Sequence, residues 1–156
     1  MRTWRVIPAV LVVVAIASAA RSRTTLPVAG AVPSTSVSLP THVPTPVMST
    51  LRRACFDCHS DETRWPWYAT LPIASHLIAR DVAEAREQLD LSRWTQYNPF
   101  DRADMLDKMC QLASSGKMPP QPYRILHPAA RLSATDLATL CTWTQDEATR
   151  LVQGEK

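Results

Sequence analysis

Apolar residues recur with a helical period over several stretches of the chain, all of them after residue 45. The longest such stripe consists of apolar residues on one face, namely Ile73, Leu77, Ile78, Val82, Ala85 and Leu89. Two more stripes follow, one made of Leu106, Met109, Cys110 and Ala113, the other of Leu137, Leu140, Cys141, Thr144, Ala148 and Leu151. Period-two alternation is missing from the sequence, so the pattern predicts an all-α fold.

Capping residues and prolines place the ends of these helices. Thr45 is a candidate cap and Pro46 a first helical residue for a helix that ends near Cys58. Ser133 and Asp136 form a capping box before the last stripe. The segments "DETRWPWYATLP", "DLSRWTQYNP" and "SSGKMPPQPYRILHP" are expected to be loops, the last because proline interrupts regular structure. The sequence therefore predicts about four helices joined by long loops.

The chain begins with a basic pentapeptide, "MRTWR", followed by an apolar run of fifteen residues, 6–20. This run contains Ala17-Ser18-Ala19, a small-x-small cleavage pattern, which is typical of an export signal. It is shorter than the roughly 20 residues of a spanning helix, yet it could remain as an anchor. Residues 1–23 are thus expected to be a signal peptide or an uncleaved membrane anchor, with a buried core helix as the alternative. Export places the rest of the chain in the periplasm or at the outer face of the cytoplasmic membrane.

Composition changes after this segment. Residues 24–45 hold four prolines among threonine, serine, valine and alanine, so we expect a semi-extended linker. The folded domain is then 46–153, a normal size for one hydrophobic core. The net charge is +3, with the basic residues scattered among acidic ones. A nucleic-acid-binding protein needs a clustered basic face, so this partner is excluded.

The motif "CFDCHS", 55–60, carries the candidate chemistry. A thioredoxin-type dithiol lies at a helix start in a βαβ unit, whereas this motif is expected to end a helix. A structural zinc site needs four ligands, usually in two close pairs, and Cys110 and Cys141 are isolated. Covalent attachment of haem fits better. Cys55 and Cys58 would form thioethers with two vinyl groups, and His59 would bind the iron.

A six-coordinate iron needs a second axial ligand. The candidates are the remaining methionines and histidines, namely His42, Met48, His76, Met105, Met109, Met118 and His127. Met118 is favoured because "GKMPP" places it in a proline-stiffened loop after a helix. Met105 and Met109 suit core packing. His76 is a candidate for a haem propionate or an exposed helix residue, and His127 is expected to be a loop residue satisfied by nearby backbone.

Residues after the motif are candidates for the wall of the haem pocket. Trp65, Trp67 and Tyr68 would either line the haem edge or fill a small core. Arg64 would pair with a propionate or lie exposed. Tyr123, five residues after Met118, is a candidate for bracing the ligand loop.

The ordered set "CFDCHS", "WPWY", "MPP...Y...HP" and "LS..D" resembles the bacterial haem-binding domain family of small monohaem c-type cytochromes. The similarity covers about residues 50–148. It implies one haem c on Cys55 and Cys58, His59 as the proximal ligand and Met118 as the distal ligand. The chain departs from the family in Cys110 and Cys141. In an oxidising compartment these two cysteines would form a disulfide, the alternative being two small buried apolar side chains.

The function expected from these features is electron transfer by an exported monohaem cytochrome domain. Its partners would be redox proteins that dock transiently, and the membrane if the N-terminal segment is retained. The sequence lacks a recognisable acid, base and nucleophile, which favours a carrier over an enzyme. The alternative is a haem-based sensor or peroxidase-type protein with a displaceable distal ligand.

Overall fold

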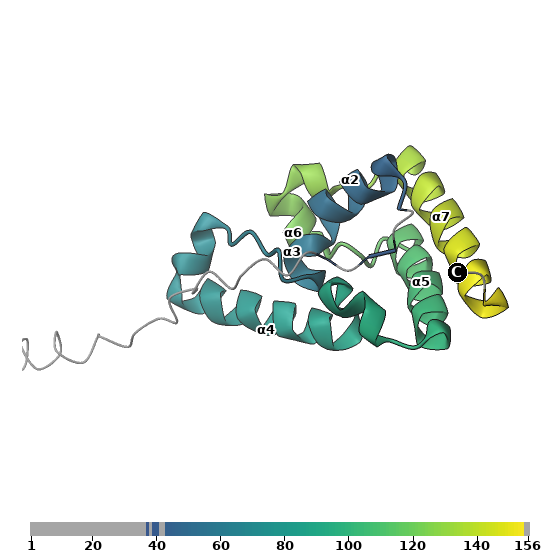
Figure 1. The fold of residues 1–156 in the computed structure, drawn as a ribbon. Coiled ribbons are helices and arrows are strands. Elements are labelled where there is room, and N and C mark those ends of the chain that lie inside the picture. Colours follow the sequence, from purple (N-terminus) through teal and green to yellow (C-terminus); the bar gives the residue numbers. More distant parts are fainter. Residues whose placement is uncertain (1–36, 38, 41–42, 155–156) are drawn as a thin grey trace, which may run out of the picture. The chain divides into compact units, whose positions relative to one another are not determined.

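The computed structural model describes residues 37, 39–40 and 43–154. The predicted signal or anchor at 1–23 and most of the predicted linker lie outside the described residues, and so does His42. Every regular element in the described part is helical (Figure 1), which confirms the all-α prediction. None of its helices has both the length and the apolar character needed to cross a membrane.

The α-helices are α2 (Thr45–Ala54), α3 (Phe56–His59), α4 (Pro72–Gln88), α5 (Pro99–Ser114), α6 (Gln121–Leu126) and α7 (Ala134–Gln153). Three short 3₁₀ helices lie between them: η1 (Trp67–Thr70), η2 (Leu91–Gln96) and η3 (Pro128–Ala130). The predicted bounds of α5 are correct, and Asn98 caps this helix by accepting from the Asp101 amide at 2.9 Å. The predicted capping box of α7 is also confirmed, with both Ser133 and Asp136 bonds present.

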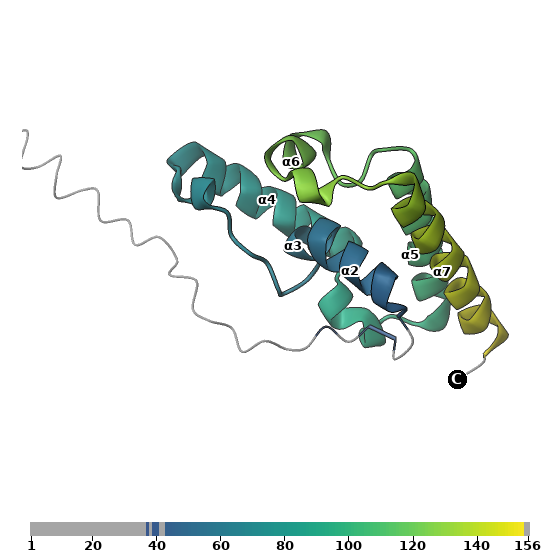
Figure 2. The ribbon, with the colours of Figure 1, turned by 90° about the horizontal axis from the view of Figure 1, so that it is seen from above.

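Helices α5 and α7 run side by side in both views (Figures 1 and 2). A disulfide between Cys110 and Cys141, with a Cα–Cα distance of 5.0 Å, joins them and settles the open alternative for these cysteines. Helix α2 packs on α7 and leads into α3, which packs on α4. The core between these helices consists of fully buried apolar side chains, among them Leu51, Phe56, Leu91, Trp94, Leu106 and Leu140. Phe56 lies inside the CFDCHS motif, so the core fixes the position of the motif.

Three local predictions are wrong. Thr45 is the first residue of α2 and not its cap, which is Pro44. The helix predicted to run to Cys58 breaks at Cys55, whose φ and ψ of −122° and −40° leave the helical region. The segment around Pro122 forms α6 because proline lacks only an N–H that the first helical turn does not use. The described part has six α-helices where about four were predicted, and η2 replaces an expected loop.

The apolar stripe predicted for α4 is buried only in part. Val82 is buried and Ile78, Ala85 and Leu89 are half-buried, whereas Ile73 is 80% and Leu77 48% exposed. Among the described elements, α4 packs mainly on α3 and η1. The period correctly predicts the helix, but burial also depends on which neighbours reach each turn.

Candidate functional site

The CFDCHS motif forms the junction between α2 and α3. The Cys55 amide closes the last turn of α2 on the Leu51 carbonyl at 2.8 Å, and the His59 amide bonds the Cys55 carbonyl at 2.9 Å. These bonds make one tight turn of the five residues from Cys55 to His59. Both thiols of the motif are half-buried and free, whereas the other two cysteines are paired with each other.

The surroundings of the two thiols differ from those of a redox-active dithiol. Burial raises the pKa of the Cys55 thiol to about 12, with the nearby Cys58 adding to the effect. Burial, followed by the charge of Asp57, also raises the pKa of Cys58. Reactive dithiols have a lowered thiol pKa, so the raised pKa values of Cys55 and Cys58 differ from those of a thioredoxin-type site.

Among the residues that the structure describes, a second pair of zinc ligands is also missing near the motif. Cys110 and Cys141 are bonded to each other and cannot serve as thiolate ligands. Across the described part of the chain, histidine, cysteine and acidic side chains do not gather in groups of three that could hold a metal ion.

His59 is oriented by a backbone carbonyl. Its Nδ1 lies 3.0 Å from the Leu89 oxygen. Because a carbonyl oxygen only accepts, Nδ1 carries the proton and the neutral ring keeps a lone pair on Nε2. Burial lowers the pKa of His59 against the opposing effect of the carbonyl bond, which favours the neutral form. This is the arrangement in which histidine binds a metal, with the second nitrogen held by an acceptor.

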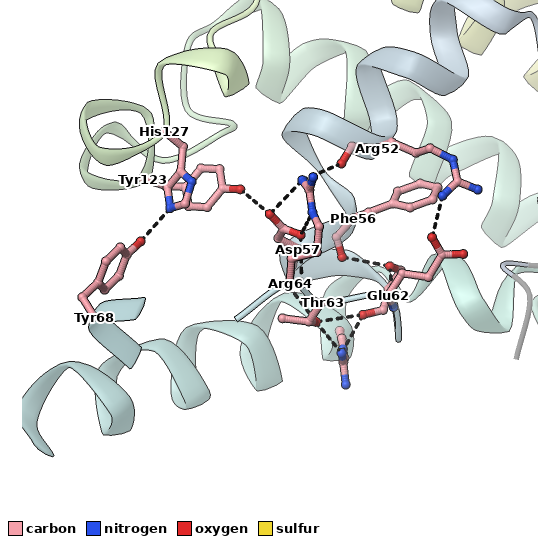
Figure 3. A network of polar contacts seen from close by, with 11 residues as sticks. Arg52, Phe56, Asp57, Glu62, Thr63, Arg64, Tyr68, Tyr123 and His127 are labelled. Carbon is pink, nitrogen blue, oxygen red and sulfur yellow. Dashed lines mark hydrogen bonds and ion pairs between the residues drawn. The ribbon is translucent and has the colours of Figure 1, made fainter. Parts of the chain in front are cut away.

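Asp57, between the two cysteines, is the centre of a polar network that sequence reasoning missed (Figure 3). The Arg64 guanidinium pairs with this carboxylate, Nε lying 3.0 Å from Oδ1. The Tyr123 hydroxyl donates to Oδ2 of Asp57 at 2.8 Å. Burial and this hydrogen bond raise the pKa of Tyr123. The network therefore ties α6 directly to the residue between the two thiols.

A second link joins α6 to η1. The Tyr68 hydroxyl lies 2.7 Å from Nε2 of His127, and the His127 ring stacks on Tyr123 with ring centroids 4.2 Å apart. The expectation that His127 would be satisfied by nearby backbone is wrong for its ring, whose partner comes from a segment 59 residues away. His127 belongs to the HP motif and Tyr68 to the WPWY motif, and both motifs were among those that resemble the haem-binding domain family. The sequence did not predict that the two side chains pair.

The other predicted site residues lie outside the polar network around Asp57. Met118 lies in the turn between α5 and α6, is 37% exposed and precedes the buried Pro119. Trp65 and Trp67 are 49% and 78% exposed, so they do not fill the core. His76 is exposed and its Nδ1 bonds the Pro72 carbonyl at 2.8 Å. Met105 and Met109 pack against the core, as predicted.

Comparison with known protein families matches residues 9–146 to the haem-binding domain. Neither the curated proteins nor the solved structures include a significant match to this chain. The family match spans most of the sequence and includes the CFDCHS motif and its network. The chain therefore belongs to the haem-binding domain family.

Proposed function

We propose that this haem-binding domain is an exported monohaem c-type cytochrome that carries single electrons. One haem would be linked covalently to Cys55 and Cys58, with His59 and Met118 as its axial ligands. Bound in this way, haem supplies reversible one-electron chemistry at its iron.

One observation carries the proposal: two free thiols and an oriented histidine lie on a single turn. Cys55 and Cys58 are free while the chain's other two cysteines are paired. His59 has its Nδ1 proton held by the Leu89 carbonyl, which leaves Nε2 as the donor atom. This donor set matches the needs of covalent haem attachment through C-x-x-C-H.

The remaining roles follow from the residues near the motif. Trp65, Trp67 and Tyr68 would cover the apolar edge of the haem. The two tryptophans are exposed, so their apolar surface would be buried against the haem. Arg64 remains a candidate for a propionate, although its guanidinium already pairs with Asp57. Histidine and methionine ligands together would raise the reduction potential relative to two nitrogen ligands.

Location and partners are part of the same proposal. The disulfide of Cys110 and Cys141 is of a kind that persists outside the cytoplasm, which supports export. Redox proteins would dock transiently at the haem edge. Retention of the N-terminal segment would hold the domain near membrane-bound partners and raise its effective concentration there.

Absorption spectra of the exported holoprotein test the attachment. We expect the reduced pyridine complex of the wild type to show two thioether-linked vinyl groups. Cys55→Ala and Cys58→Ala should each shift the band towards one free vinyl group, and the double variant should release its haem on acid extraction. Covalent haem in the double variant, or none in the wild type after expression with an attachment system, would overturn the proposal.

Spectra of the native ferric protein test the axial ligand. A sulfur-to-iron charge-transfer band should be present in the wild type and lost in Met118→Ala. Met105→Ala, which changes a half-buried methionine of α5, serves as the matched control and should keep the band. A band that survives in Met118→Ala would assign the distal ligand to another residue.

A sensor or peroxidase-type function is the second candidate, favoured by the 37% exposure of Met118. An exposed thioether is more easily displaced by a small external ligand than a buried one. Cyanide titration of the ferric protein separates the two functions. Saturation at micromolar cyanide would favour the sensor, whereas resistance at millimolar cyanide would favour the carrier.

A further inference from the structure

Helix α6 follows Met118 closely along the chain, yet apolar burial does not hold it in place. It contains no buried residue, and its two aliphatic side chains, Ile125 and Leu126, are 62% and 60% exposed. A six-residue helix without a buried face is not stable by itself. Its position must therefore depend on other contacts.

Those contacts are polar. Arg124 donates to the Gly116 carbonyl at 3.2 Å, which ties α6 to the Met118 turn itself, and the contacts to the rest of the site come from the aromatic side of α6. Tyr123 donates to the Asp57 carboxylate at 2.8 Å, a charge-assisted bond. Arg64 pairs with the same carboxylate and fixes it. His127, just after α6, stacks on Tyr123 and pairs with the Tyr68 hydroxyl at 2.7 Å. We call Asp57, Tyr68, Tyr123 and His127 the α6 clamp (Figure 3).

The other end of the Met118 turn is fixed separately. The amides of Lys117 and Met118 both bond the Leu112 carbonyl of α5, at 3.0 and 3.1 Å. Met118 thus lies between one attachment to α5 and a second attachment, through Tyr123, to the motif that holds the two thiols. Loss of the second attachment would let the turn swing about its α5 end.

We propose that the α6 clamp is a positioning device that holds the Met118 sulfur over the iron by bonding α6 to Asp57. This inference rests on the proposed function, because it acts through Met118 as the distal ligand. Tyr123 is its central positioning residue, since it both bonds Asp57 and stacks on His127. The clamp sets how readily the distal ligand leaves.

The test is Tyr123→Phe in the ferric holoprotein, titrated with imidazole. Imidazole binds the iron as the Met118 sulfur leaves, without a change of oxidation state. Its apparent affinity grows with the fraction of molecules in which the turn is open. Loss of a hydrogen bond to a charged group should raise this affinity about tenfold. Covalent haem should be retained, and the Arg124 and His127 amides should exchange faster with solvent.

Thr149→Val is the control, because that hydroxyl donates to the Gln145 carbonyl within α7 and not to α6 or the CFDCHS motif. It should leave the imidazole affinity within about twofold of the wild type. Equal affinities in Tyr123→Phe, Thr149→Val and the wild type, with the sulfur-to-iron band present in all three, would overturn the clamp alone. A wild type with covalent haem but without that band would overturn the Met118 assignment and the clamp with it.

Discussion

Asp136 shows how one side chain can join two helices at the residue scale. As the third residue of α7 it accepts from the Ser133 amide at 2.8 Å and from the Ser133 hydroxyl at 2.7 Å. From α2 it receives the Arg53 guanidinium at 2.6 Å and the Thr50 hydroxyl at 3.2 Å. The bonds from Ser133, followed by those from Arg53, hold the pKa of Asp136 well below its ordinary range.

Asp136→Asn should lower the free energy of unfolding by about 1–2 kcal/mol, because it removes a charged capping partner and an ion pair. Urea unfolding at pH 7 measures this difference. Asp107→Asn, a change on the exposed face of α5, is the control and should stay within about 0.5 kcal/mol of the wild type. An equal loss of unfolding free energy in both variants would show that the contacts of Asp136 with Ser133 and Arg53 add no particular stability.

The same carboxylate predicts a dependence on pH. A folded-state pKa below the ordinary value means that the stabilisation is present above about pH 4 and is lost as the pH falls further. The gap between the wild type and Asp136→Asn should therefore narrow below pH 4. Unfolding at a series of pH values measures the gap, and a constant gap from pH 7 to pH 2 would contradict this explanation.

At the scale of elements, the disulfide joins the longest packed pair, α5 and α7. It spans 31 residues and thereby closes a loop that contains Met118, α6 and η3. Cross-linking a loop of this length restricts the unfolded chain and stabilises the fold by about 3–4 kcal/mol. The double variant Cys110→Ser with Cys141→Ser should lose about that amount in urea unfolding.

Reduction of the wild type gives an independent control for this prediction. A phosphine reductant should destabilise the wild type to the level of the double variant and leave the double variant unchanged. Both forms should keep the proposed covalent haem, since Cys55 and Cys58 are separate from the disulfide. Equal stability of oxidised and reduced wild type would contradict a stabilising role.

The helices predicted most accurately from the sequence are those in which several local signals agree. Helices α4, α5 and α7 combine long apolar stripes with prolines or capping residues at their starts, so their positions were predicted well. Helix α6 was missed because its prolines were interpreted as breakers, although Pro122 lies in the first turn. The exposure of Ile73 was also missed, since a period defines a face but not the partner that covers it.

In the candidate site, too, local features were predicted from the sequence and long-range contacts were not. Cys55, Cys58 and His59 lie within five consecutive residues, and their spacing alone predicted them as site residues. The Leu89 carbonyl is a backbone atom 30 residues from His59, and any residue could supply it. The bond between Asp57 and Tyr123 spans 66 residues and appears only when the chain folds. Such long-range pairs leave no periodic or local pattern in the sequence.

At the scale of the whole molecule, the proposed function links the domain to the N-terminal segment. A domain that needs covalent haem also needs delivery to the compartment in which haem is attached. The segment 1–23 has the basic start and apolar run of an export signal. The disulfide between α5 and α7 has the same requirement for an oxidising compartment.

Removal of residues 1–23 should therefore abolish haem attachment and disulfide formation together, although the amino-acid sequence of the domain is unchanged. Haem staining of denatured protein and thiol labelling of Cys110 and Cys141 measure the two losses in cell fractions. Fusion of residues 24–156 to a known cleavable signal is the matched control, and it should restore both modifications. Covalent haem on the cytoplasmic form would show that attachment does not depend on export. A fusion that is exported and oxidised but carries no haem would instead locate a further requirement within residues 1–23.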